Sequence, residues 1–301
     1  MLKVSLVILN WNGIDDTLEC LTSAMKLNAE GLRLEIIVVD NGSTDNSLKE
    51  LGKIKEITLI KNNENLGFSG GNNVGIKYAL KNEADYIVVL NNDVTLEKNS
   101  IKELISQMAS DSTIGASSPK IYFSKGYEYK KGRYKTSDLG RVIWYAGGVI
   151  DWANVYGQTN GVDKVDRGQF DEVYETDFAT GTCMIVSREV IEKVGMFDER
   201  YYMYYEDTDL SQRIKKSGYK IVFNPKSIIW HKVAQGSGIG STNNDYFISR
   251  NRMLFGMRYA RLRTKLAIIK ESLRLLFRGR SWQRIGVRDY YLGKLGKGSW
   301  K

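Results

Sequence analysis

Short apolar runs alternate with amphipathic stretches over the first 90 residues of the chain. The runs contain few polar residues, which is typical of strands buried on both faces of a sheet. They lie at residues 4–9, 34–39, 56–60 and 85–90. The stretches between them have helical spacing and lie near residues 15–27, 45–52 and 70–81. This alternation predicts an α/β fold with a mainly parallel, Rossmann-like central sheet and helices on both of its faces.

Each of the four apolar runs is followed by polar residues. The polar segments are NWNG at 10–13, DNGSTD at 40–45, NNENLGFSGGNN at 62–73 and NNDV at 91–94. Parallel strands bring their carboxyl ends to one edge of the sheet, where ligands of open α/β folds bind. The sequence therefore predicts a single polar cleft at that edge.

The pattern loosens between residues 110 and 180 into short apolar pieces separated by turns. We expect a small antiparallel, loop-rich part there that closes the cleft. Residues 176–195 then have the pattern of a strand followed by a helix, with Ser187 as the N-cap and Gly195 at the helix end.

Composition indicates an ordered globular protein of 301 residues, with 42% hydrophobic and 26% charged residues. Such a chain can bury a core in one large domain, alone or with an appendage. No apolar run reaches the roughly 18 residues of a membrane span, and the N-terminus does not resemble a signal peptide, so we expect a cytoplasmic location. The only two cysteines, Cys20 and Cys183, are expected to be packed thiols.

Positive charge is concentrated near the C-terminus. Residues 250–301 carry a net charge of +13, whereas the remaining residues carry −4. Apolar residues recur there at spacings of four and three, flanked by Lys and Arg; they are Leu262, Leu266, Ile269, Leu273 and Leu276. We favour a basic amphipathic helix on an anionic membrane surface, and a helix packed on the core with a solvated basic face is the alternative. A nucleic-acid partner is disfavoured, because no known binding motif is present and the larger part of the chain is acidic.

Candidate ligand-binding groups lie in the second and third polar segments. Asp40 follows a strand and can accept hydrogen bonds from a base or a ribose hydroxyl. The glycines at the start of the next helix allow an anion to approach backbone N–H groups, and two asparagines beside them favour a ligand over a purely structural turn. This set is Gly67, Gly70, Gly71, Asn72 and Asn73.

A second group of candidates lies in the stretch YYMYYEDTD at 201–209. The acids at its end suit a helix N-terminus, and capping accounts for part of the pattern. Aromatic side chains beside a carboxylate are also typical of a sugar-binding wall that contains a general base. We therefore predict Asp207 as the base and an acceptor-binding surface formed by Trp144, Tyr204, Tyr205 and Glu206.

Asp93 and His231 are the candidates for metal binding. A divalent cation on a diphosphate commonly takes few protein ligands, since phosphate and water supply the other oxygens. Asp93, next to Asn92 in the fourth polar segment, could therefore suffice with one further group. His231 is the only histidine and follows an apolar run, although packing alone is the commoner role of such a residue.

Six segments in order over residues 3–231 together resemble the inverting glycosyltransferases of family 2, most closely their bacterial rhamnosyltransferase-like branch. The segments are VSLVILNWNG, IIVVDNGSTDNS, NNENLGFSGGNNVGI, VVLNNDV, TGTCMIVSREVIEKVGMFDERYYMYYEDTDLSQRIKKSGYKI and IIWH. The resemblance implies the GT-A fold, a nucleotide-diphospho-sugar donor and a divalent cation, Mg or Mn. It also implies a catalytic domain over residues 1–240 with a basic helical extension over 241–301.

The resemblance assigns roles at the donor side by position. Asp40 is implied as a nucleoside contact, with the turn at Asn10 and Trp11 beside it. Asp93 stands where the last acid of the family's Asp-x-Asp motif binds the metal and the diphosphate. The chain departs from the family at Asn91, where many relatives carry Asp, and this removes one negative charge from the metal site.

The resemblance also gives Asp207 the position of the general base and His231 that of a late metal-associated histidine. It implies transfer of a sugar to a glycan or lipid-linked glycan in cell-surface polysaccharide synthesis. The first expected donor is dTDP-rhamnose, and the second is a UDP-hexose. The alternative is a catalytically silent nucleotide-sugar-binding protein on the same fold. A peripheral position on the inner face of the plasma membrane and a homodimer are also left open.

Overall fold

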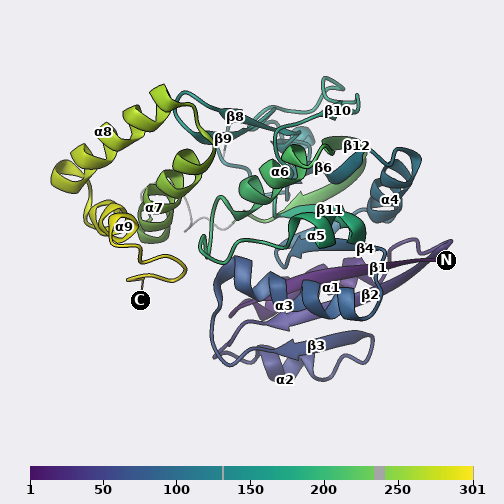
Figure 1. Cartoon of the computed structure of the whole chain (residues 1–301). Coiled ribbons are helices and arrows are strands. Elements are labelled where there is room, and N and C mark those ends of the chain that lie inside the picture. The colour runs from purple at the N-terminus through teal and green to yellow at the C-terminus, as the bar shows by residue number, and fades with distance from the viewer. Residues whose placement is uncertain (131, 234–240, 301) are drawn as a thin grey trace.

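The computed structural model describes residues 1–130, 132–233 and 241–300, and its first third alternates strands and helices as the apolar pattern predicts (Figure 1). The strands are β1 (Leu2–Asn10), β2 (Leu32–Asp40), β3 (Ile57–Lys61) and β4 (Tyr86–Asn91). The helices are α1 (Ile14–Ala24), α2 (Ser47–Leu51) and α3 (Gly67–Lys81). β1 pairs in parallel with β2 and β4, and β2 pairs in parallel with β3, so the prediction of a parallel sheet is confirmed here.

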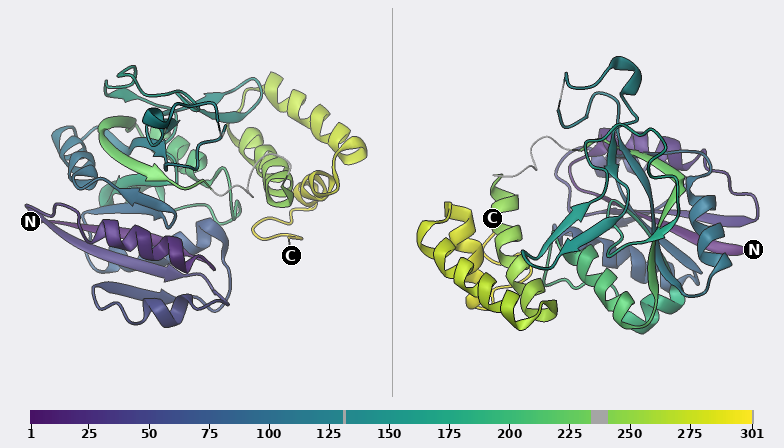
Figure 2. Two further views of the ribbon diagram at one scale, coloured as in Figure 1. Left: turned by 180° about the vertical axis from the view of Figure 1, so that it is seen from behind. Right: turned by 90° about the horizontal axis from the view of Figure 1, so that it is seen from above.

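Alternation along the strands separates two apolar cores, one on each face of the sheet. In β1, Leu6 and Ile8 join the core that α1 and α4 (Ser100–Ser110) cover, whereas Val7 faces α3. α5 (Arg188–Val194) and α6 (Glu206–Lys216) pack on the same face as α3. α3 lies in front of the sheet in Figure 1, and α1 in the reverse view of Figure 2. Burial of each such aliphatic side chain contributes about 1.5–3 kcal/mol.

The second half of the chain extends the same sheet to ten strands. The added strands are β5 (Val94–Leu96), β6 (Ile114–Phe123), β7 (Ile143–Tyr145), β10 (Tyr174–Glu175), β11 (Cys183–Ser187) and β12 (Lys220–His231). The main order is β10-β12-β6-β11-β4-β1-β2-β3, with β5 paired to β12 and β7 to β6. β11 is antiparallel to both of its neighbours, whereas β12 is parallel to β6. A separate hairpin consists of β8 (Gly148–Asp151) and β9 (Tyr156–Thr159), and a 3-10 turn covers Thr136–Asp138.

The expectation of short strands throughout residues 110–180 is wrong for β6. This strand is ten residues long, every residue in it is buried, and it lies inside the sheet. Its apolar pattern is interrupted by buried polar residues, among them Ser118 and Lys120, and the Lys120 ammonium is satisfied by Asp166 at 2.9 Å. The rest of the region is the small antiparallel part that the sequence predicts, and Ser187 and Gly195 cap α5 as expected.

The C-terminal part is helical, as predicted. It consists of α7 (Thr242–Tyr259), α8 (Leu262–Arg278) and α9 (Ser281–Tyr291) (Figure 2). α7 packs on the sheet domain, with Arg250, Asn251 and Phe255 fully buried. The boundary expected at residue 240 falls in the stretch 234–240, outside the described residues. Among the helices that the structure describes, none is long and apolar enough to cross a bilayer.

Candidate active site

A cleft of about 420 Å³ lies where β4 and β12 end and α6 begins. Six of the predicted site residues line it together, although they come from four separate segments of the chain. They are Asp93, Trp144, Tyr204, Glu206, Asp207 and His231. The candidate base and the candidate metal ligands therefore share one cavity.

Asp207 lies in the first turn of α6, and its carboxylate is held on both oxygens. Oδ2 accepts a hydrogen bond from Gly181 N at 2.9 Å, and Oδ1 accepts one from Thr208 N at 2.6 Å. Burial raises the pKa of Asp207, and these hydrogen bonds oppose the rise because they favour the charged form. A carboxylate with a raised pKa is a stronger base than an exposed one.

Glu206, one residue earlier, is 6% exposed, and its Oε2 has no hydrogen-bond partner among the residues that the structure describes. Burial raises the pKa of Glu206 well above its usual value, and the neighbouring Asp207 carboxylate raises it further. The two adjacent acids therefore favour different protonation states, with the proton on Glu206.

Replacing Glu206 with Gln is expected to stabilise the protein increasingly as the pH rises. The native state keeps the Glu206 proton, whereas the unfolded chain loses it near pH 4.3, so the wild type loses up to about 1.4 kcal/mol of stability per pH unit above that value. Gln is neutral at every pH and removes this loss. Thermal unfolding of both proteins at pH values above about 4.3 tests the expectation. A stability difference between variant and wild type that does not change with pH would contradict it.

Asp93 and His231 form a pair in the same cleft, where β12 pairs with β5. His231 Nε2 lies 3.1 Å from Asp93 Oδ1, and Trp144 packs edge-on against the imidazole with ring centroids 4.7 Å apart. The contact of Asp93 Oδ1 with the imidazole does not have hydrogen-bond geometry, and among the described residues neither this oxygen nor the buried His231 Nδ1 has a hydrogen-bond partner. Such unsatisfied atoms fit a cation, although residues 1–130, 132–233 and 241–300 contain no cluster of three or more acidic, His or Cys ligands. The site therefore suits a divalent cation that takes most of its ligands from a bound phosphate and water.

Asp40 is connected to this site through a chain of buried hydrogen bonds. Asn10 Nδ2 donates to Asp40 Oδ1 at 2.8 Å, Thr17 Oγ1 donates to Asn10 Oδ1 at 2.8 Å, and Asn92 Nδ2 donates to Thr17 Oγ1 at 2.9 Å. Asp40 is fully buried, does not line the cleft and joins strand ends beside Asp93, and its contact with a nucleoside stays a prediction. Trp11, 53% exposed at the end of β1, is the candidate on this side that is open to a ligand.

The glycines and asparagines of α3 are engaged in packing. A Cβ on Gly71 would lie 2.5 Å from Leu9 Cδ1, so this glycine lets α3 approach β1. A Cβ on Gly70 would lie 2.9 Å from Leu66 Cβ. Asn73 Nδ2 donates to Phe197 O at 2.9 Å, and Asn72 Nδ2 donates to the carbonyl one turn earlier in α3. None of these residues lines the cleft, and their contact with a donor stays a prediction.

Tyr205 lies apart from the other residues predicted to bind the acceptor. Its backbone has φ 72° where α6 begins, and its hydroxyl donates to Val155 O at 2.7 Å. The ring is buried, and its centroid lies 5.4 Å from that of the Phe255 ring of α7. Tyr205 therefore lies away from the cleft, whereas Tyr204 and Trp144 line it as expected.

Gly181, which holds the base, was not among the predicted site residues, although it lies in a segment that carries the family resemblance. Gly181 lines the cleft between Thr180 and Thr182, and its backbone N–H binds Asp207. A Cβ on Gly181 would lie 3.0 Å from the Phe68 ring, and this close approach is the one property that marks the residue. Backbone donors leave no signal in the residue type, so this contact requires the structure.

The fold is that of the GT-A glycosyltransferases, as two solved structures show. The crystal structure of GalNAc-T7 with UDP, GalNAc and Mn²⁺ superimposes with a TM-score of 0.60 at 20% identity, covering 84% of this chain and 51% of that one. The mannosyltransferase PcManGT from Pyrobaculum calidifontis, in complex with GDP-Man and Mn²⁺, gives a TM-score of 0.54 at 14% identity, covering 96% and 74%.

The chain belongs to glycosyl transferase family 2, whose model matches residues 5–195. It is 30% identical over 190 residues to the low-salt glycan biosynthesis hexosyltransferase Agl10 of Haloferax volcanii, covering 62% of this chain and 55% of the relative. It is 28% identical to the N-acetylglucosaminyl-diphospho-decaprenol L-rhamnosyltransferase of Mycobacterium tuberculosis, covering 68% of each chain. The dTDP-rhamnosyl transferase RfbF of Shigella flexneri is 26% identical, with 67% and 61% covered. The matched part of the chain thus spans between 55% and 68% of the length of these relatives.

Proposed function

We propose that this protein transfers a sugar, with inversion, from a nucleotide-diphospho-sugar to a hydroxyl of a glycan or lipid-linked glycan. The observation that carries the proposal is the shared cleft, in which the Asp207 carboxylate and the Asp93–His231 pair both face one cavity. Membership of family 2 and the GT-A fold support the same reaction.

The reaction is a single displacement. Asp207 accepts the proton of the acceptor hydroxyl while its oxygen forms a bond to the anomeric carbon, and the bond from that carbon to the diphosphate oxygen breaks. Attack comes from the side opposite the leaving group, so the configuration inverts and no covalent sugar intermediate forms. Asp93 and His231 would hold a divalent cation, which offsets the negative charge on the departing nucleotide diphosphate.

We infer that the donor is a deoxyhexose or hexose nucleotide, with dTDP-rhamnose first and UDP-hexoses second. The names of the M. tuberculosis and S. flexneri relatives support rhamnose, and Agl10 supports the broader class of hexoses. A panel of nucleotide sugars tested for thermal stabilisation with Mg²⁺ or Mn²⁺ distinguishes these donors, and transfer to a lipid-linked acceptor then tests the activity. Absence of both stabilisation and transfer across the panel would contradict the proposal.

We propose further that α8 binds an anionic membrane surface, which would place the protein at the inner face of the plasma membrane. Four apolar residues on one side of α8 are open to solvent: Leu262 (72% exposed), Leu266 (60%), Leu273 (47%) and Phe277 (81%). Spacings of 4, 11 and 15 residues from Leu262 place them on a single helix face. Ile268 and Ser272 pack the opposite side onto the protein. Lys270 and Arg274 flank the exposed face, which supports a negatively charged partner.

Replacing Leu266 and Phe277 together with Gln is expected to abolish co-flotation with phosphatidylglycerol-containing vesicles, because the exposed apolar face is lost while the charge is unchanged. Both side chains are mostly exposed, so thermal stability should be retained. Wild-type protein should float with these vesicles and not with pure phosphatidylcholine. Equal flotation of variant and wild type would show that α8 is not a membrane anchor. A doubled mass of the wild type in sedimentation, lost in the variant, would show instead that this face of α8 packs against a second copy of the chain.

A further inference from the structure

The loop of residues 201–205, immediately before the two acids of the cleft, has an unusual backbone. Tyr202, Tyr204 and Tyr205 have φ angles of 64°, 67° and 72°. This left-handed region is costly for a residue with a bulky side chain, and three such residues in five persist only where the surroundings hold them. Tyr205 is also the N-cap of α6, so the loop sets where the helix begins and in which direction the Asp207 side chain projects from it.

A single side chain of α7 holds the carbonyls of this loop. Asn251 is fully buried, and its Nδ2 donates to Tyr201 O at 2.9 Å, Met203 O at 2.7 Å and Tyr204 O at 2.9 Å. The two N–H groups of the amide are thus shared among three carbonyls that no regular secondary structure satisfies. Their convergence on one point requires the left-handed turns of the loop.

Arg250 fixes the orientation of the Asn251 amide. Its Nε donates to Asn251 Oδ1 at 3.0 Å, which turns the amide nitrogen toward the loop, and its guanidinium also donates to Tyr201 O at 3.0 Å. Arg250 is fully buried, and its guanidinium lies over the rings of Tyr246 and Phe247. Contacts outside the loop therefore fix the orientation of both Arg250 and Asn251.

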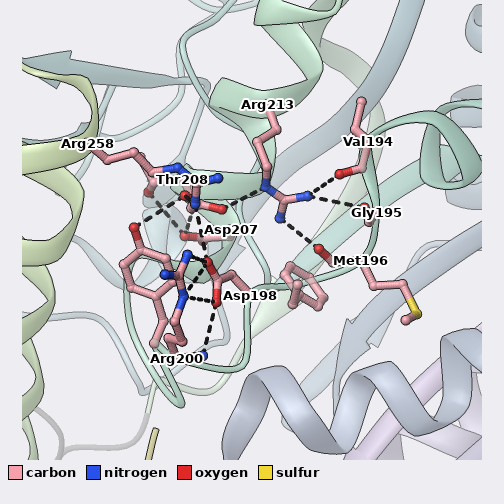
Figure 3. A network of polar contacts seen from close by, with 12 residues as sticks. Val194, Gly195, Met196, Asp198, Arg200, Asp207, Thr208, Arg213 and Arg258 are labelled. Atoms are coloured by element: carbon pink, nitrogen blue, oxygen red, sulfur yellow. Dashed lines mark hydrogen bonds and ion pairs between the residues drawn. The ribbon is translucent and has the colours of Figure 1, made fainter. Parts of the chain in front are cut away.

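The same helix also holds the first turn of α6 on the far side of the two acids. Asp209 is fully buried and accepts hydrogen bonds from Arg258 at 2.9 Å and from Tyr259 at 2.8 Å, both of α7. Arg213 contacts Asp209 at 2.8 Å and donates to the carbonyls of the 194–196 turn. Figure 3 shows the Arg213 and Arg258 side chains reaching this turn of α6 beside Asp207.

The start of α3 supports the opposite face of the loop. Ser69 N donates to Tyr202 O at 3.1 Å, and a Cβ on Gly67 would lie 2.5 Å from the Tyr202 ring. Gly67 itself has φ 73°, so glycine is needed there both for the backbone and for the approach of Tyr202. The loop is consequently enclosed between α3 and α7.

We propose that Asn251, oriented by Arg250, is a positioning residue that holds the left-handed 201–205 loop and thereby places Asp207 for proton transfer. The inference rests on the proposed function, because Asp207 is the base of that reaction. It makes α7 part of the catalytic unit and not a separable extension. The Asn251 amide nitrogen binds loop carbonyls, so it acts on Asp207 through the backbone of the loop.

Replacing Asn251 with Ala is expected to lower kcat by roughly 10²-fold while the KM for the nucleotide-sugar donor is unchanged, because a small displacement of a reacting group has an effect of that size. Asn251→Ser keeps one short donor and should give a smaller loss, which also protects the test if the alanine variant does not fold. Asn224→Ala is the matched control: Asn224 is another buried asparagine that holds a carbonyl, Glu103 O at 3.1 Å, and it lies away from the cleft and α7. It should retain wild-type kcat despite a comparable fall in thermal stability.

Hydrogen exchange separates this inference from the reaction itself. Amides of residues 200–207 should exchange faster in Asn251→Ala and Asn251→Ser than in wild type or Asn224→Ala, and this needs no substrate. Unchanged exchange there would overturn the inference even if the enzyme transfers sugar as proposed. Faster exchange in an Asn251 variant that keeps wild-type kcat would overturn the positioning role. Faster exchange in the Asn251 variants, together with a wild-type protein that transfers no sugar from any donor, would locate the failure in the proposed reaction.

Discussion

Replacing Asp207 with Asn is expected to lower kcat by roughly 10²–10⁴-fold while donor binding is retained. The amide has nearly the shape of the carboxylate but cannot accept the proton of the acceptor hydroxyl. The loss should therefore lie in the chemical step and not in the affinity for the nucleotide sugar. Single-turnover transfer measures the first quantity, and calorimetric titration with the donor measures the second.

Asp177→Asn is the matched control for this change. Asp177 lies outside the cleft and pairs with Lys215 at 2.8 Å, so the same loss of charge there should leave kcat unchanged. The pH profile provides a second check, because burial raises the pKa of Asp207 and the base works in its deprotonated form. Transfer should rise with pH through a value above the usual aspartate range near 3.9. Near wild-type transfer by Asp207→Asn, or a flat profile down to about pH 4, would remove Asp207 from this role.

The strands of the first half could be predicted because each has an apolar central run, which in β1, β4 and the second half of β2 is buried. Polar residues follow these runs where the cleft begins, as at β4, where Asn91 follows Leu90 and is the last residue of the strand. β6 has the same buried environment, but it satisfies polar side chains internally through Lys120 and Asp166. Its pairing partners lie far away in the chain, and no local pattern reveals them.

The site shows the same division between local and long-range information. Asp93, Asp207 and His231 stand at the ends or starts of elements, and the family motifs mark them. The contacts that hold the base are not visible in the sequence, because Gly181 uses its backbone N–H and Asn251 binds backbone carbonyls of a distant segment. The position of Tyr205 is hidden for a related reason: its residue type suggests a sugar contact, but its backbone has a left-handed φ and its ring packs against Phe255 of α7.

Replacing Asp93 with Asn, or removing divalent cations with a chelator, is expected to raise the donor KM by roughly 10–10³-fold. One carboxylate close to a cation contributes about 1–4 kcal/mol at a cleft surface, and each 1.4 kcal/mol is tenfold in affinity. The pattern is the reverse of that for Asp207→Asn, because here the donor is bound less tightly. Added Mn²⁺ or Mg²⁺ should restore the chelated wild type, and Asp93→Asn should need a much higher cation concentration.

Asn91→Asp tests the same electrostatic argument in the opposite direction. Asn91 lines the cleft with Asp93 and His231, and an additional carboxylate there would add a negative charge to a site that has one. The half-saturating concentration of Mn²⁺ in donor-binding titrations should fall by about tenfold. Because cation affinity and acceptor deprotonation depend on different side chains, the single-turnover rate at saturating cation and donor should stay close to wild type. If neither chelation nor Asn91→Asp changes donor binding, Asp93 and His231 do not hold a cation, and the charge on the leaving diphosphate must be offset by protein groups alone.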